Sequence, residues 1–148
     1  GLVALKARPG ACAAPFAVPS PLQCPALDYG SSFSRGVEFS AGGLRRLYIS
    51  GTASIEPGGR SVHIGDTRAQ VELTLDVVQA ILDDRRMAWA DVSRAIAYFK
   101  DAAEAPLLDA CLAARGIAPM PVVYANTDIC RDDLLFELEL DAVTAADA

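Results

Sequence analysis

The sequence has little of the material from which metal sites and nucleophilic triads are built. It contains one histidine, His63, and four cysteines, Cys12, Cys24, Cys111 and Cys130, with no Cys-x-x-Cys pair. A Cys/His zinc site needs several such ligands at short spacings, and a serine or cysteine nucleophile needs a neighbouring base. We therefore expect no metal and no cofactor. The cysteine spacing suggests no disulfide framework, which favours a reduced, cytoplasmic setting.

Basic residues are also in the minority. The chain has 13 Lys and Arg against 19 Asp and Glu, which gives a formal net charge of −6. Nucleic-acid binding needs a basic surface, so RNA and DNA are not expected as partners. No apolar run approaches the ~18 residues of a membrane helix, so no membrane partner is expected either. A small anionic carboxylate substrate is compatible with this charge, because one well-placed arginine can bind it.

The first part of the chain differs in composition from the rest. Residues 1–28 are rich in Ala and Pro, and the prolines interrupt every apolar run, which is unlike a signal peptide. We expect an irregular arm or linker over 1–28. The 148-residue length favours a single core, so one domain is expected over 29–148.

Hydrophobic periodicity then predicts the fold. Val71, Leu75, Val78 and Leu82 recur at three- and four-residue steps, which predicts a helix with one buried stripe and Asp66 as its N-cap. The predicted elements are strands at 32–40 and 44–54, a helix from 66 to 83–86, a strand at 91–101, a helix at 104–116, and strands at 121–131 and 134–143. This order predicts an α+β sandwich, with one mixed sheet and both helices packed on one of its faces.

The two faces of the predicted sheet differ. The alternation places apolar residues, among them Val123, Leu138 and Leu140, on the face that we expect to meet the helices. The opposite face is expected to carry Tyr48, Ser50, Tyr124, Asn126, Asp128, Cys130, Glu137 and Glu139. One interpretation is the solvated face of an antiparallel sheet. The other is a subunit interface with clefts, where desolvation raises the pKa of a carboxyl group and suits it to be a general acid.

One long stretch resembles a known family. The segment LYISGTASIEPGGRSVHIGDTRAQVELTLDVVQAIL, residues 47–82, is similar to the signature of the YjgF/RidA (L-PSP endoribonuclease-like) proteins, and the likeness extends over roughly 33–143. It implies a chorismate-mutase-like α+β fold and a homotrimer with ligand clefts between subunits. The enamine/imine deaminases of this family hold a substrate carboxylate with an arginine and use a glutamate on the last strand. Here Glu137 matches the glutamate, whereas Val123 or a near neighbour occupies the arginine position.

A second resemblance is to the C-terminal catalytic domain of the chorismatases. It rests on SGTASI at 50–55, HIGD at 63–66 and D-I-C-R-x-x-L-L-x-E at 128–137. The Ala/Pro-rich start then corresponds to an inter-domain linker or to the arm of a stand-alone relative. This resemblance implies a hydrolase in which a carboxylic acid protonates a CH2=C(X)–COO− group and pyruvate is released.

These resemblances give candidate roles to several residues. Glu137 is the candidate acid. Arg131 is the candidate carboxylate anchor, or it pairs with a neighbouring Asp. Cys130 either lies in the ligand site, as in one chorismatase subtype, or is a small buried hydrophobe.

Tyr124, Ser50 and Gly51 each have two possible roles. Tyr124 either contacts a cyclic ligand or packs at an interface. Ser50 and Gly51 either direct backbone N–H groups at an oxyanion, or Gly51 only permits a bulge. Glu139 is expected to be an ordinary charge, and His63 a surface residue.

Three functions follow from these expectations. The first is a chorismatase-like enzyme acting on an enol-ether or enamine carboxylate. The second is a non-catalytic, trimeric small-ligand-binding protein, which Val123 at the arginine position favours. The third is an enamine/imine deaminase. Which arginine anchors a substrate carboxylate is left open by the sequence.

Overall fold

The architecture is an α+β sandwich, as the sequence predicts. The computed structural model describes residues 6–10 and 14–146. In this part of the chain six strands form one sheet: β1 (Phe16–Val18), β2 (Gly36–Ala41), β3 (Leu44–Ala53), β4 (Val92–Phe99), β5 (Val122–Asn126) and β6 (Phe136–Ala145). The two α-helices there are α1 (Thr67–Asp84) and α2 (Pro106–Ala114), and short 3-10 helices lie at Ala26–Tyr29, Trp89–Asp91 and Ala102–Glu104.

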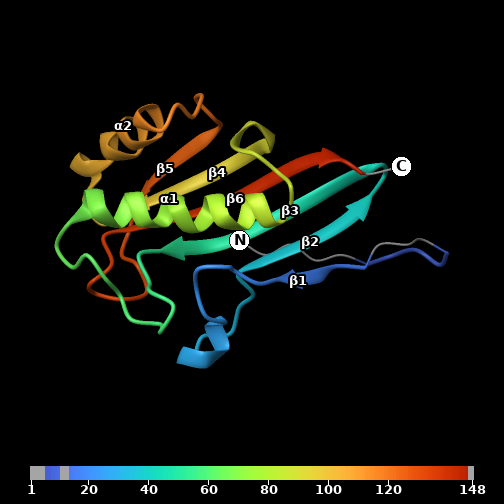
Figure 1. Cartoon of the computed structure of the whole chain (residues 1–148), viewed down its shortest axis with the longest axis horizontal. Helices are drawn as coiled ribbons and strands as arrows, with labels where there is room; N and C mark the ends of the chain where they lie inside the picture. Colours follow the sequence, from blue (N-terminus) through green and yellow to red (C-terminus); the bar gives the residue numbers. More distant parts are fainter. Residues whose placement is uncertain (1–5, 11–13, 147–148) are drawn as a thin grey trace.

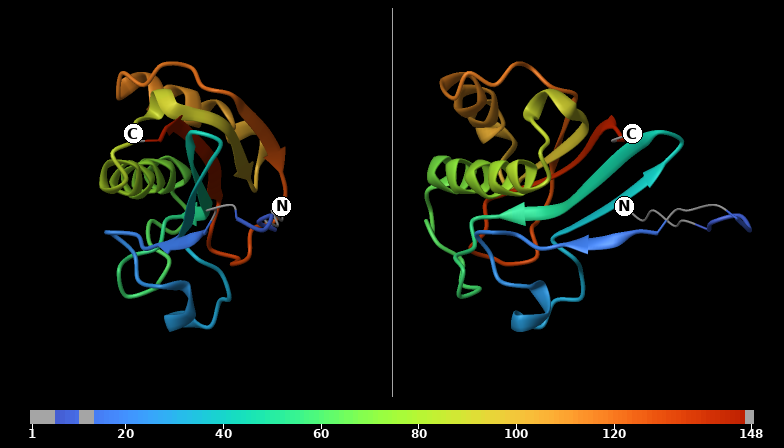
Figure 2. Two further views of the ribbon diagram at one scale, coloured as in Figure 1. Left: turned by 90° about the vertical axis from the view of Figure 1, so that its right-hand side faces the viewer. Right: turned by 45° about the vertical axis from the view of Figure 1, so that its right-hand side comes forward.

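The sheet is mixed. Its strand order is β1-β2-β3-β6-β4-β5, and every neighbouring pair is antiparallel except the parallel pair β4–β5. The sheet is strongly twisted, and both helices lie on the same side of it (Figure 1, Figure 2). The other face, called the open face below, is not covered by an α-helix of the described chain.

The core lies between α1 and the sheet. The predicted stripe of Val71, Leu75, Val78 and Leu82 is fully buried and packs in one cluster with Leu47, Ile49, Leu138 and Leu140 of β3 and β6. Burying side chains of this size is the main favourable term in folding, at roughly 1.5–3 kcal/mol each. Among the described residues no helix is long and apolar enough to span a membrane.

Two polar side chains at the N-terminus of α1 fix the local structure: one caps the helix and the other binds the segment before β6. The Asp66 carboxylate accepts a hydrogen bond from the Ala69 N–H at 2.9 Å, so it is the predicted N-cap. Gln70 is fully buried, and its amide donates to the Asp133 carbonyl and accepts from the Leu135 N–H. This amide fixes the segment that leads into β6, where the candidate acid lies.

The N-terminal segment is more ordered than the predicted irregular arm. It contains β1, which pairs with β2, and the 3-10 turn at Ala26–Tyr29. The buried Gln23 side chain donates to the carbonyls of Ala53 and Ile55 at 2.9 and 3.0 Å. The segment is therefore fastened to the end of β3. The strand expected at 121–131 also ends earlier, at Asn126, because residues 127–135 form a connection to β6.

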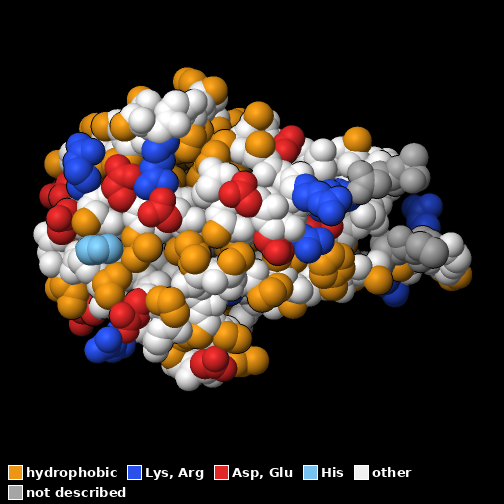
Figure 3. Space-filling model, in the orientation of Figure 1, with side chains coloured by type: hydrophobic (Ala, Val, Ile, Leu, Met, Phe, Trp, Pro, Cys, Tyr) orange, Lys and Arg blue, Asp and Glu red, His pale blue; other side chains and the backbone are white. Residues whose placement is uncertain are grey.

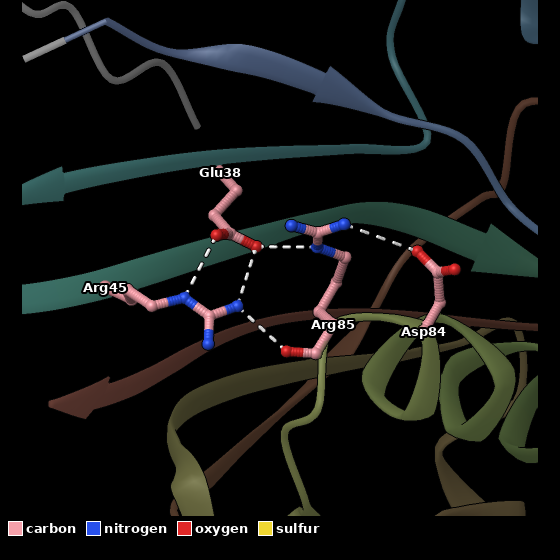
Figure 4. Close-up of polar contacts among 4 residues, drawn as sticks. All are labelled: Glu38, Arg45, Asp84 and Arg85. Carbon is pink, nitrogen blue, oxygen red and sulfur yellow. Dashed lines mark hydrogen bonds and ion pairs between the residues drawn. The ribbon is translucent and has the colours of Figure 1, made fainter. Parts of the chain in front are cut away.

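An ion cluster joins the sheet to the end of α1 (Figure 4). The Glu38 carboxylate, only 5% exposed, accepts hydrogen bonds from Arg45 and Arg85, and Arg45 also donates to the Arg85 carbonyl at 2.8 Å. Burial by itself raises the pKa of Glu38, but the two guanidinium groups outweigh it and the pKa is lowered. Glu38 is therefore held ionised on the helix side of the sheet.

Candidate functional site

The open face of the sheet is hollowed into a cavity of about 1050 Å3. Its walls come from the N-terminal segment, β2, β3, β4, the β5–β6 connection and β6. The cavity thus gathers segments from both ends of the chain, and Glu137 is one of the side chains that line it.

Glu137 lies near the start of β6, between Tyr98 of β4 and Ala53 of β3. Its carboxyl group lies against Gly51, since a Cβ added at Gly51 would be 2.7 Å from the carboxyl carbon and closer still to Oε1. The pairing of β3 with β6 shifts between Ile49 and Thr52, so the glycine is part of a bulge. Only a residue without a side chain leaves room for the carboxyl group there.

The environment of Glu137 favours the protonated form. Burial raises the pKa of Glu137, and the nearby charge of Glu139 raises it further. Burial and the same charge of Glu139 also raise the pKa of Tyr98, the cross-strand neighbour. A carboxylic acid that keeps its proton toward neutral pH is what general acid catalysis requires.

Glu139 has a cationic partner. Arg94 donates to Glu139 at 3.2 Å and to Asp141 at 2.9 Å, which joins β4 to β6 on the open face. Arg94 is 46% exposed, so this pair contributes little to stability. Glu139 therefore has a structural partner in Arg94, while its charge also acts on Glu137.

Arg131 lies in the cavity wall without a carboxylate partner. Its Nη1 donates to the Gly59 carbonyl at 2.9 Å and contacts Ser61 Oγ at 3.3 Å, and its guanidinium carbon lies 4.8 Å from the Tyr29 ring centroid. Within the described ranges it forms no ion pair, so the alternative of pairing with a neighbouring Asp is not what the structure shows.

Cys130 and Ser50 also line the cavity. Cys130 is exposed rather than buried, so the reading as a small buried hydrophobe is wrong. Partial desolvation and the charge of Glu137 raise the pKa of its thiol. The Ser50 N–H donates to the Arg35 carbonyl at 3.0 Å and its hydroxyl to the Ser34 carbonyl. That N–H is therefore occupied, so the first of the two open readings, an oxyanion contact, does not apply to the Ser50 N–H.

Tyr124 does not reach the cavity, so its predicted place on the open face is wrong. β5 pairs with β4 so that Tyr124 lies beside Ala97, whose side chain is buried under the helices. The Tyr124 hydroxyl donates to Asp109 of α2, and Val123, 60% exposed, takes the open face instead. The predicted placement of the apolar Val123 toward the helices is wrong, because β5 is an edge strand, where an apolar side chain is tolerated on the exposed face.

Several cavity residues were not expected from the sequence. Tyr29, Phe33 and Arg35 come from the N-terminal segment and its junction with β2, and Tyr98 comes from β4. An arginine two residues after a phenylalanine is a weak signal, and no spacing in the sequence relates it to Glu137. Only the path of the N-terminal segment across the sheet brings them together.

Neither His63 nor a cluster of metal-ligating side chains indicates a second functional site in the described part of the chain. His63 lies in an exposed turn with φ of 56°, and its Nδ1 is 3.1 Å from Ser54 Oγ, outside the large cavity. Over residues 6–10 and 14–146 no group of three or more His, Cys, Asp or Glu side chains is placed to hold a metal ion. On the helix-covered face, Lys and Arg side chains lie among Asp and Glu side chains (Figure 3).

Comparison with known proteins supports the fold. No family model matches the sequence. A curated chorismatase from Streptomyces hygroscopicus is 34% identical over 103 residues, which are 64% of this chain and 30% of the relative. A chorismatase crystal structure superposes with a TM-score of 0.74 at 28% identity, covering 87% of this chain and 44% of the other. The YjgF gene product of E. coli gives a TM-score of 0.68 at 20% identity, covering 86% of this chain and 98% of the other.

The chain therefore has the YjgF/RidA fold. Within that fold it is similar in both sequence and structure to the chorismatases, as residues 50–55 and 128–137 predicted. It spans about 30% of the length of the curated chorismatase that it matches.

Proposed function

We propose that this chain is a chorismatase-like hydrolase, which protonates an enol-ether carboxylate, CH2=C(X)–COO−, and releases pyruvate. The observation that carries the proposal is the Glu137 carboxyl group, placed in a large cavity against Gly51 with its pKa raised by burial and by Glu139. The likeness to chorismatases supports an ether oxygen as X. Neither a metal nor a cofactor has a step in this chemistry.

The reaction begins with proton transfer from Glu137 to the methylene carbon, which becomes a methyl group. The double-bond electrons form the new C–H bond and leave an oxygen-stabilised cation at the carbon that carries X. Water adds to that carbon and returns a proton to the Glu137 carboxylate. The resulting hemiketal then collapses. The bond between its central carbon and the ether oxygen X breaks, and X takes up the proton of the hemiketal hydroxyl group. The products are pyruvate and an alcohol. A positioned general acid contributes about 10²–10⁴-fold in rate to such a step.

The other groups of the cavity have supporting roles in this proposal. Arg131 offers a permanent cation for the substrate carboxylate, because a guanidinium group is not deprotonated at neutral pH. Cys130 and Gly51 shape the cavity next to Glu137, and both line it together with Ser50. The substrate class is thus a small anionic carboxylate.

The assembly is part of the proposal. We infer a homotrimer whose subunits meet over the open face. The resemblance to the YjgF/RidA family implies this assembly, and the YjgF gene product of E. coli resembles this chain along most of its length. The exposed Val123 lies on the open face and would be covered by a neighbouring subunit. Light scattering after gel filtration is expected to give a trimer mass, and a monomer at micromolar concentration would contradict it. The cytoplasmic setting and the lack of nucleic-acid partners stay predictions from the sequence.

Ligand binding without turnover is a second candidate function. Val123, at the position of the deaminases' arginine, favours it over deamination. Under this alternative, chorismate raises the melting temperature of the wild-type chain but is recovered intact. Hydrolysis of 2-iminopropionate would instead support a deaminase.

The test of the proposed function is incubation of the chain with chorismate, with pyruvate followed through lactate dehydrogenase. We expect pyruvate release above the buffer rate, and a loss of about 10²-fold or more in Glu137→Gln. Glu72→Gln is the matched control, because Glu72 of α1 pairs with Arg115 away from the cavity and is expected to leave the rate nearly unchanged. Absence of pyruvate at high enzyme concentration would contradict the proposal.

A further inference from the structure

Three carboxyl groups form a row on the open face of β6. Glu137, Glu139 and Asp141 occupy alternate positions of the strand, so their side chains share one face, and all three line the large cavity. Neighbours in the row are about 6.6 Å apart along the strand, which is twice the rise per residue. Like charges at this separation disfavour one another, so the three groups do not lose their protons independently.

In the described part of the chain, one arginine pairs with this row, and it reaches only two of the three acids. Arg94 of β4 binds Asp141 with two hydrogen bonds, from Nε to Oδ2 at 2.9 Å and from Nη2 to Oδ1 at 3.0 Å. It donates a single bond, from Nη1, to Glu139 Oε1 at 3.2 Å. Glu137 forms no ion pair with a described residue. The arginine is shared at the far end of the row, so Glu137 has a negative neighbour and no cationic partner.

The other groups around Glu137 do not supply the missing cation. Tyr98 and Cys130 are uncharged at neutral pH, because burial and nearby carboxylates raise the pKa of both. Arg35 and Arg131 each donate to a backbone carbonyl instead of to a carboxylate. The titratable and charged side chains that share the cavity with the row are Tyr29, Arg35, Tyr48, Arg94, Tyr98, Asp128, Cys130 and Arg131.

We propose that Arg94 and Glu139 are positioning residues that determine which carboxyl group of the row holds the proton. Arg94 keeps Glu139 and Asp141 ionised, and the charge of Glu139 then keeps the proton on Glu137, from where it is delivered to the substrate. The inference rests on the proposed function for the role of Glu137 as the acid. Arg94 and Glu139 act through Glu137 in this account and make no contact with the reacting carbon.

The ionisation midpoint of Glu137 tests the proposal without any substrate. The full chain is labelled with glutamate carrying 13C at the side-chain carboxyl carbon, and the Glu137 signal is identified by its loss in Glu137→Gln. The signal is then followed by NMR from about pH 4 to about pH 9 at low, fixed ionic strength, where charge interactions are least screened. Glu139→Gln removes the negative neighbour, so the midpoint should fall by at least about 0.5 pH unit, which is the Coulomb interaction at ~6.6 Å in a water-like dielectric. Arg94→Gln leaves Glu139 without its cation, so the midpoint should instead rise by at least about 0.3 pH unit.

The opposite signs of these two shifts distinguish the proposal from a merely structural role. Glu72→Gln and Arg115→Gln are the matched controls, because Arg115 also bridges two carboxylates, Glu72 and Asp76, but outside the cavity. Both controls should leave the midpoint within about 0.2 pH unit of wild type, and so should Glu139→Asp, which keeps the charge. A shift smaller than about 0.2 pH unit in Glu139→Gln, or a fall in Arg94→Gln, overturns the proposal. Pyruvate release from chorismate tests the proposed function separately, since its absence would not alter these midpoints.

Discussion

Gly51→Val tests whether the position of the Glu137 carboxyl group depends on a missing side chain. A Cβ at this position would lie 2.7 Å from the carboxyl carbon, well inside van der Waals contact, and valine adds two methyl groups to it. The colliding atoms are the end of a flexible side chain, so the carboxyl group is expected to move rather than the strand. Overpacking of this kind costs about 1–3 kcal/mol, which corresponds to roughly 3–10 °C in melting temperature for a chain of this size.

The loss of activity should be larger than the loss of stability. With the acid displaced, the rate of pyruvate release from chorismate should fall by about 10²-fold or more at 25 °C, where the variant is still folded. Gly58→Val is the matched control, because an added Cβ there meets only the carboxyl group of Glu56, with Oε1 at 3.3 Å, in an exposed loop. A folded Gly51→Val variant that keeps more than about a third of the wild-type rate would refute the reasoning.

Three other predictions concern stability and the placement of side chains. Glu38→Gln leaves Arg45 and Arg85 without their shared carboxylate and should cost about 2–4 kcal/mol, a fall of roughly 5–12 °C in melting temperature at pH 7. Because the folded-state pKa of Glu38 is lowered, this difference should shrink as the pH falls through that pKa; a constant difference would contradict it. Glu137 has a raised pKa, so its contribution to stability is fully present below its ordinary pKa and is lost as the pH rises through the folded value. Denaturant unfolding should therefore show Glu137→Gln gaining stability relative to wild type on going from pH 4 to pH 8, and an opposite trend would refute the burial argument. Tyr124→Phe removes one hydrogen bond on the helix face and should cost about 0.5–1.5 kcal/mol without changing the rate with chorismate, whereas a tenfold loss of rate would place Tyr124 in the site.

Local patterns in the sequence predict the helix side of this fold well. The stripe from Val71 to Leu82 and the N-cap at Asp66 follow from spacing and side-chain chemistry that act within one or two turns. The open-face position of Glu137 also follows from alternation along a single strand. These features depend on residues that are close in the sequence, so they can be predicted from the sequence alone.

Features that depend on how strands pair across the sheet cannot be predicted from local sequence patterns. The face of Tyr124 depends on its register with Ala97 in the parallel pair β4–β5, and alternation alone gives two opposite answers. Tyr29 and Phe33 lie beside Arg35 in the cavity wall, and Gln23 fastens the segment that carries these rings to the end of β3. The contact of Glu137 with Gly51 likewise needs the bulge in β3, which a lone glycine only suggests.

The central claim is that Glu137 delivers a proton to the methylene carbon of an enol-ether carboxylate. The reaction of chorismate in D2O measures this step, with lactate dehydrogenase present to trap pyruvate as lactate before its methyl group exchanges with solvent. The account predicts lactate with one deuterium in its methyl group from the wild-type chain, and a rate of its formation reduced about 10²-fold or more in Glu137→Gln. A methyl group without deuterium, or an undiminished rate in Glu137→Gln, would contradict it.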